Sequence, residues 1–134
     1  MKELRIEALT DNLSRVLEFI DTELENNDCG MKAQMQIDVA VEELFVNVAS
    51  YAYGEETGMA DISLDIDENR CARITIIDSG IPYDPLAKED PDVTLSAEDR
   101  SIGGLGIYMV KKSMDDFTYE YKDGKNVVTI TKAI

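Results

Sequence analysis

The chain of 134 residues contains no histidine. This absence excludes catalytic triads built on histidine, metal sites with histidine ligands, and phosphorylation of the chain itself on histidine. Any general base must therefore be a carboxylate, a lysine or a cysteine. Its two cysteines, Cys29 and Cys71, form no C-x-x-C pair and offer no disulfide framework, which favours a reducing cytoplasm as the location.

Positive charge is also scarce, since 13 Lys and Arg residues stand against 28 Asp and Glu residues and leave a net charge of −15. Such a protein repels phosphate backbones and anionic lipid headgroups, so we expect neither nucleic acid nor membrane as a partner. No run approaches the roughly 18 apolar residues of a membrane span. Residues 1–7 have no apolar signal core, and we expect a cytoplasmic protein that is neither exported nor membrane-spanning.

What the chain does contain is enough apolar material for a core: 44% of its residues are hydrophobic, and only 3 are proline. These proportions are typical of a folded domain and predict a single domain over residues 1–134.

Hydrophobic periodicity predicts an order of strand, two helices, two strands, a long loop, a helix and two strands. Strand patterns cover residues 3–9, 61–67, 71–77, 117–122 and 126–131, and helix patterns cover residues 11–26, 31–53 and 103–114. Thr10 and Asp11 are the predicted N-cap of the first helix. Adjacent strand pairs with helices grouped between them predict an α/β (α+β) fold, a two-layer sandwich in which the helices lie on one face of a mixed, mostly antiparallel sheet.

The loop at about 79–102 holds all three prolines and loses all periodicity. Structureless loops longer than about 12–15 residues are uncommon in compact domains and are often functional. We therefore predict that this segment is a lid over a binding site.

Glu43 and Asn47 are four residues apart on the second predicted helix, so they face the same direction. Their neighbours are largely apolar, and burial of unpartnered polar groups would cost about 1–3 kcal/mol each. A metal-bound ligand would supply the missing partners. A solvated polar pair is the alternative interpretation.

Asp78 and Gly80 follow directly on a predicted strand. Such residues often begin a turn. Alternatively, the carboxylate can accept a hydrogen bond from an exocyclic amine such as that of adenine, while the glycine lets a flat base approach the backbone.

Gly103, Gly104, Leu105 and Gly106 open the third predicted helix. Unhindered amides at a helix N-terminus can receive phosphate oxygens, although a glycine-rich hinge is the alternative. The segment lacks the Gly-Lys-Ser/Thr of a Walker A loop and the spacing of a dinucleotide fingerprint.

Taken together, the order and spacing of these motifs resemble the GHKL ATP-binding superfamily. Glu43 and Asn47 match its N box, Asp78 and Gly80 match its first glycine box, and Gly103, Gly104 and Gly106 match its second. The segments DSGIPYDP at 78–85 and GGLGI at 103–107 are most similar to the small bacterial anti-sigma-factor serine kinases, over nearly the whole chain. Pro82 departs from the broader superfamily, which has glycine there.

The resemblance implies the GHKL (Bergerat) fold and a site for ATP and Mg²⁺. In it, Asn47 would hold the metal, Asp78 would select adenine, and Gly80 would admit the base. The amides of Gly104, Leu105 and Gly106, next to Gly103, would bind phosphates. Arg100 or Lys88 on the lid would meet the γ-phosphate, although either residue is equally a solvated loop charge, and that interpretation is favoured for Lys88. Glu43 would be the catalytic base, in preference to Glu42, which lies about 100° further round the helix.

The same resemblance implies the partners. The protein would phosphorylate a serine of a STAS-domain anti-anti-sigma protein, sequester a sigma factor, and pair as a homodimer. Arg15 would contact a partner, unless it is an ordinary exposed helix charge. The alternative function is a nucleotide-dependent binding module that switches partners with little or no phosphoryl transfer.

Overall fold

The computed structural model describes residues 1–87 and 104–134. The described chain forms an α+β fold, as predicted, and no helix in it is long and apolar enough to cross a bilayer. The strands are β1 (Lys2–Glu7), β2 (Met59–Ile66), β3 (Cys71–Asp78), β4 (Asp116–Lys122) and β5 (Lys125–Ala133). The α-helices are α1 (Leu13–Asn26), α2 (Met31–Asn47) and α3 (Gly104–Ser113).

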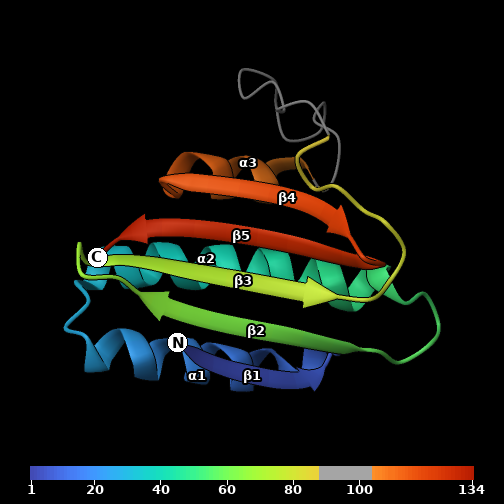
Figure 1. Ribbon diagram of the computed structural model, residues 1–134, viewed down its shortest axis with the longest axis horizontal. Helices are drawn as coiled ribbons and strands as arrows, with labels where there is room; N and C mark the ends of the chain where they lie inside the picture. Colours follow the sequence, from blue (N-terminus) through green and yellow to red (C-terminus); the bar gives the residue numbers. More distant parts are fainter. Residues whose placement is uncertain (88–103) are drawn as a thin grey trace.

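The strands form one sheet in the order β1-β2-β3-β5-β4. Every pairing between these strands is antiparallel. The sheet in the described part of the chain is therefore entirely antiparallel, where the prediction was a mixed, mostly antiparallel sheet. The helices lie on one face of the sheet, with α1 near the β1 edge, α2 behind the centre and α3 near the β4 edge (Figure 1). This arrangement is the predicted two-layer sandwich.

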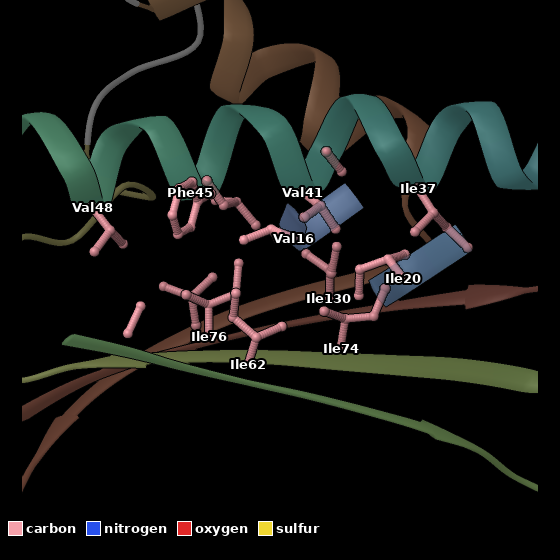
Figure 2. Packing of buried hydrophobic residues seen from close by; sticks show 14 of the residues in the cluster. Val16, Ile20, Ile37, Val41, Phe45, Val48, Ile62, Ile74, Ile76 and Ile130 are labelled. Carbon is pink, nitrogen blue, oxygen red and sulfur yellow. The ribbon is translucent and has the colours of Figure 1, made fainter. Parts of the chain in front are cut away.

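The core lies between the sheet and the helices, and the period-two alternation of the strands builds it. Ile62, Ile74 and Ile76 point from the sheet toward Phe45 of α2 and Val16 of α1 (Figure 2). All of these side chains are fully buried or nearly so. Because burying such a side chain contributes about 1.5–3 kcal/mol relative to leaving it exposed, this layer fixes how α2 lies across β3 and β5.

The predicted N-cap of the first helix is wrong. Residues Thr10–Asn12 form a 3₁₀ turn, and α1 begins only at Leu13, without a side-chain capping bond. Asn12 instead uses its Nδ2 to donate to the Glu7 carbonyl oxygen at 2.9 Å. A polar side chain next to the predicted cap residues therefore ties the turn to the end of β1.

The predicted second helix changes its geometry before it ends. The α-helix stops at Asn47, and Val48–Ala52 continues as a π-helix. Wider π turns of this kind are frequent at functional sites. The carbonyl oxygen of Ala52, at the end of this segment, accepts a hydrogen bond of 2.8 Å from the Ile81 amide. The helix end is thereby joined to the chain that leaves β3.

Two carboxylic acids meet where α1 packs on α2. Asp21 and Asp38 each have one carboxylate oxygen that is shielded from solvent and accepts no hydrogen bond from any described residue. Burial, the largest cause, together with the neighbouring Asp21 carboxyl group and a smaller contribution from the charge of Glu25, raises the pKa of Asp38 to about 7. A proton on Asp38 supplies the donor that the pair lacks.

This pair predicts that stability falls as pH rises. The folded-state pKa of Asp38 lies above its unfolded value, so the contribution of the protonated pair is complete below about pH 4 and is lost as pH rises through about 7. We expect Asp38→Asn to raise the free energy of unfolding at pH 8 by about 1–2 kcal/mol, discounted for solvent access, and to change it little at pH 4. Urea titrations at both pH values test this.

Asp116→Asn, at an exposed position of β4, is the matched control and should give the same difference from wild type at both pH values. Equal effects of the two substitutions at pH 8 would contradict the assignment.

Candidate functional site

A cavity lies between the C-terminal end of α2, the end of β3 and the start of β5. Three of its lining residues, Asn47, Asp78 and Asn126, offer amide or carboxylate side chains. The rest are apolar or aromatic: Leu44, Val48, Tyr51, Ala52, Tyr83, Pro85 and Val128. A mostly apolar hollow with a few converging polar groups is the usual form of a small-molecule site. Two residues predicted from separate motifs, Asn47 and Asp78, therefore share one cavity.

Glu43 lies one helical turn before Asn47 on α2, and its carboxyl group is half-buried. Burial raises the pKa of Glu43 above its usual value, and the charge of neighbouring Glu42 raises it further. A carboxylate with a raised pKa is a stronger proton acceptor than a solvated one. The predicted alternative, a fully solvated pair, does not describe this helix face.

The Glu43 carboxyl group packs against the first turn of α3. A Cβ atom added to Gly106 would lie 2.2 Å from Glu43 Cδ, so only glycine lets the two helices approach this closely without moving Glu43. Glu43 and Gly106, which belong to two separate sequence motifs, therefore lie next to each other.

Asp78 is the last residue of β3, and it is 5% exposed. Its Oδ1 accepts two hydrogen bonds, from the Gly80 amide at 2.9 Å and from Asn126 Nδ2 at 2.9 Å. Its Oδ2 accepts none from the described part of the chain. One carboxylate oxygen is therefore fixed by the protein, and the other is left to accept a bond from a ligand.

Asn126 is a site residue that the sequence reasoning missed. It is 3% exposed, lies opposite Asp78 in the pairing of β5 with β3, and lines the cavity. The signal was present, because the alternation along β5 places Asn126 on the same face as the buried Val128 and Ile130. A polar side chain at an inward-facing position is expected to have a specific partner.

Aromatic residues form the outer wall. Tyr51 and Tyr83 stack with ring centroids 5.8 Å apart and an interplanar angle of 23°. Tyr53 fixes the exit of β3, because its hydroxyl donates to the Met59 carbonyl oxygen at 2.6 Å and accepts from the Ser79 amide at 2.8 Å. Tyr83 and Pro85 belong to the predicted lid, so the first part of that loop contributes to the cavity.

Gly80 has a different structural role from the one predicted. It does not line the cavity, and a Cβ atom placed on it would lie 2.1 Å from the Ala52 carbonyl oxygen. Backbone atoms held by the Ile81 amide cannot easily move away. The glycine therefore lets the chain after β3 pack against the π-helical end of α2.

We expect Gly80→Ala to lower the free energy of unfolding by about 1–3 kcal/mol, the usual cost of overpacking. Gly30→Ala is the matched control, because nothing lies within 4 Å of the added methyl group and the backbone there is extended. Its expected net cost is under about 0.5 kcal/mol, because alanine is a poorer N-cap residue than glycine but reduces the entropy of the unfolded chain. Chemical denaturation compares the two, and equal losses would contradict the close contact.

The remaining predicted residues divide into three groups. Lys88, Arg100 and Gly103 lie outside the described residues. Gly104 and Leu105 form the first turn of α3, next to Gly106. Arg15 is exposed on α1 and does not line the cavity. Helix α1 lies near the opposite edge of the sheet from α3 (Figure 1).

No cluster of three or more acidic or cysteine side chains suited to a metal occurs in residues 1–87 and 104–134. A dedicated cage of protein ligands is therefore absent from this part of the chain. Asn47 offers one amide oxygen at the cavity wall. Mg²⁺ is commonly held by one or two protein oxygens, with waters and substrate phosphates completing its shell, so this donor set fits Mg²⁺ bound together with a nucleotide.

Comparison with known proteins agrees with this geometry. Residues 6–132 match a family described as the histidine kinase-like ATPase domain. The chain is 31% identical over 100 residues to the serine-protein kinase RsbW of Bacillus cereus (strain AH820), covering 72% of this chain and 61% of that protein. It is 32% identical over 103 residues to RsbW of Listeria monocytogenes serovar 1/2a (strain EGD-e), covering 73% and 64%. The chain thus spans less than two thirds of the length of these relatives.

Solved structures show the same fold. The RsbU and RsbW domains of Rv1364c from Mycobacterium tuberculosis align with a TM-score of 0.64 and 15% identity, over 98% of this chain and 32% of that one. The histidine kinase domain of the blue-light activated kinase EL346 from Erythrobacter litoralis aligns with a TM-score of 0.58 and 16% identity, over 92% and 60%.

Proposed function

This chain belongs to the histidine kinase-like ATPase family, and we propose that it is an ATP-dependent serine kinase of the anti-sigma type. Its substrate is a serine of a STAS-domain anti-anti-sigma protein, and it also sequesters a sigma factor. The observation that carries the proposal is the convergence of Asn47 and Asp78 on one cavity, with Glu43 one helical turn away.

The cavity suits an adenine base. Asp78 Oδ2 is available to accept a bond from the exocyclic amine, whereas Oδ1 is already occupied by Gly80 and Asn126. Leu44, Val48 and Val128 offer apolar surface to the faces of a flat ring. Gly80 supports this arrangement by closing the loop against α2, rather than by touching the base.

The phosphates and the metal belong toward α3. We assign Asn47 to Mg²⁺, and we assign the α3 amides of Gly104, Leu105 and Gly106 to the phosphates, together with Gly103 and Arg100 on the adjoining lid. When bound, Mg²⁺ would neutralise phosphate charge that a protein of net charge −15 would otherwise repel.

Glu43 is the proposed catalytic base. Its carboxylate would take the proton from the substrate serine hydroxyl as the serine oxygen bonds to the γ-phosphorus of ATP, while the bond from that phosphorus to the bridging oxygen breaks and ADP leaves. Its position against Gly106 places it beside the helix start assigned to the phosphates. Glu42 is exposed on another face of α2 and is not the base.

The partners are proposed from the relatives, which are named serine-protein kinases. Arg15 on the exposed surface of α1 is the proposed partner contact. The cytoplasm is the proposed location, because a sigma factor acts there.

The test is transfer of labelled phosphate from ATP to a purified STAS-domain protein encoded near the gene. We expect label on a serine of that protein, dependent on Mg²⁺. Nucleotide-dependent binding of the STAS protein without labelling would instead support the switch module, and would contradict the kinase assignment.

A further inference from the structure

Asn126 is held by four hydrogen bonds that use the full capacity of its side chain. Its Nδ2 donates to Asp78 Oδ1 at 2.9 Å and to the Ile81 carbonyl oxygen at 2.8 Å. Its Oδ1 accepts from the Tyr119 hydroxyl at 2.5 Å and from the Tyr83 amide at 3.1 Å. One side chain of β5 therefore joins β3, β4 and the first residues after β3.

These partners determine which way the amide faces. The Ile81 carbonyl can only accept and the Tyr83 amide can only donate, so the NH₂ group must lie on the Asp78 side. Rotating the amide by half a turn would set two acceptors, Asn126 Oδ1 and Asp78 Oδ1, against each other. Burial raises the pKa of the Tyr119 hydroxyl, which keeps it protonated and able to donate.

From this network we propose that Tyr119 and Asn126 are positioning residues that make the cavity select adenine over guanine nucleotides. The inference rests on the proposed ATP site. Asn126 occupies Asp78 Oδ1, so Oδ2 alone faces the ligand and only accepts. Adenine places an amino donor at its C6 position, whereas guanine places a carbonyl acceptor there, and two facing acceptors repel.

An Asn126 that was free to turn would weaken this discrimination. Its NH₂ group could donate to the guanine carbonyl, and Asp78 could then accept from the ring N–H and the amino group of guanine. The Ile81 carbonyl and the Tyr83 amide oppose this rotation because each has a fixed polarity. The Tyr119 hydroxyl, on β4, adds a further hydrogen bond that holds Asn126 in that position. Selectivity is therefore expected to depend on a hydroxyl outside the cavity lining.

The experiment measures the dissociation constants of Mg-ATP and Mg-GTP by calorimetry for wild type, Tyr119→Phe and Asn126→Asp. We expect wild type to prefer ATP by at least about 100-fold. Tyr119→Phe should reduce the ATP-to-GTP preference by about tenfold, the value of one lost buried hydrogen bond. Asn126→Asp sets a second carboxyl group beside Asp78 and should weaken ATP binding by at least about tenfold.

Tyr121→Phe is the matched control. Tyr121 lies on the same strand two residues away and is 47% exposed, and its hydroxyl is not among the partners of the Asn126 side chain, although its backbone pairs with that of Asn126. It should leave both dissociation constants unchanged. Retained preference in Tyr119→Phe, in a protein with wild-type circular dichroism, would overturn this inference while leaving the ATP site intact. Failure of the wild type to bind ATP would overturn the proposed function itself.

Discussion

Glu43→Gln is expected to slow phosphoryl transfer by about 10²–10⁴-fold, the usual contribution of a positioned general base. Glutamine keeps the size of the side chain and its packing against Gly106, but it cannot take the proton from serine. The dissociation constant of Mg-ATP should change by less than about threefold, because Glu43 is assigned no contact with the base. Single-turnover kinetics on the STAS substrate, alongside calorimetry, separate the two quantities.

Glu42→Gln provides the control, since it removes an adjacent negative charge from an exposed position of the same helix. Its effect on transfer should be small. Because Glu42 contributes to the raised pKa of Glu43, its removal should move the acidic limb of the pH–rate profile to lower pH. Equal losses of rate in the two variants would argue against Glu43 as the base.

Asp78→Asn is expected to weaken ATP binding by about 100-fold, which combines a lost charged hydrogen bond with a new repulsive contact. Gly80 and Asn126 both donate to the Oδ1 position, so the introduced amide must keep its oxygen there. Its NH₂ group then faces the amino group of adenine, and two donors oppose each other. Calorimetry with Mg-ATP measures the loss.

Asp65→Asn, at an exposed position of the neighbouring strand β2, should leave the affinity unchanged. The same amide in place of Asp78 would suit the guanine carbonyl, so GTP affinity should fall much less than ATP affinity. A parallel loss for both nucleotides would indicate that the substitution damaged the fold and not the recognition of the base.

Most of the fold could be predicted from the sequence, because the hydrophobic patterns that indicate each helix and strand are local. Period-two alternation in β2 and β3 and helical spacing in α1 reflect the face that each element buries, and the structure has these elements within about three residues of the predicted bounds. The start of α1 and the end of α2 could not be predicted as well. The Asn12 side chain bonds to Glu7, and the π-helical turn after Asn47 depends on contacts with residues 80 and 81.

The candidate site could be predicted only in part, because local patterns identify single residues but not their arrangement in space. Glu43, Asn47 and Asp78 stand in motifs whose spacing is readable along the chain, but their convergence requires the packing of α2 against β3. Asn126 carries no motif, and its importance arises from its cross-strand position opposite Asp78. The role of Gly80 depends on its distance to Ala52, which no pattern within 78–85 encodes.

The central proposition is that residues from α2, the end of β3 and the start of α3 surround one nucleotide. Titration of the ¹⁵N-labelled protein with Mg-ATP, followed by amide chemical shifts, tests it most directly. The account predicts that the amides of Asn47, Asp78, Gly80 and Gly104–Gly106 shift together with one shared dissociation constant, while Arg15 and Asp65 do not respond. Absent shifts, or shifts confined to only one of the three segments, would contradict it.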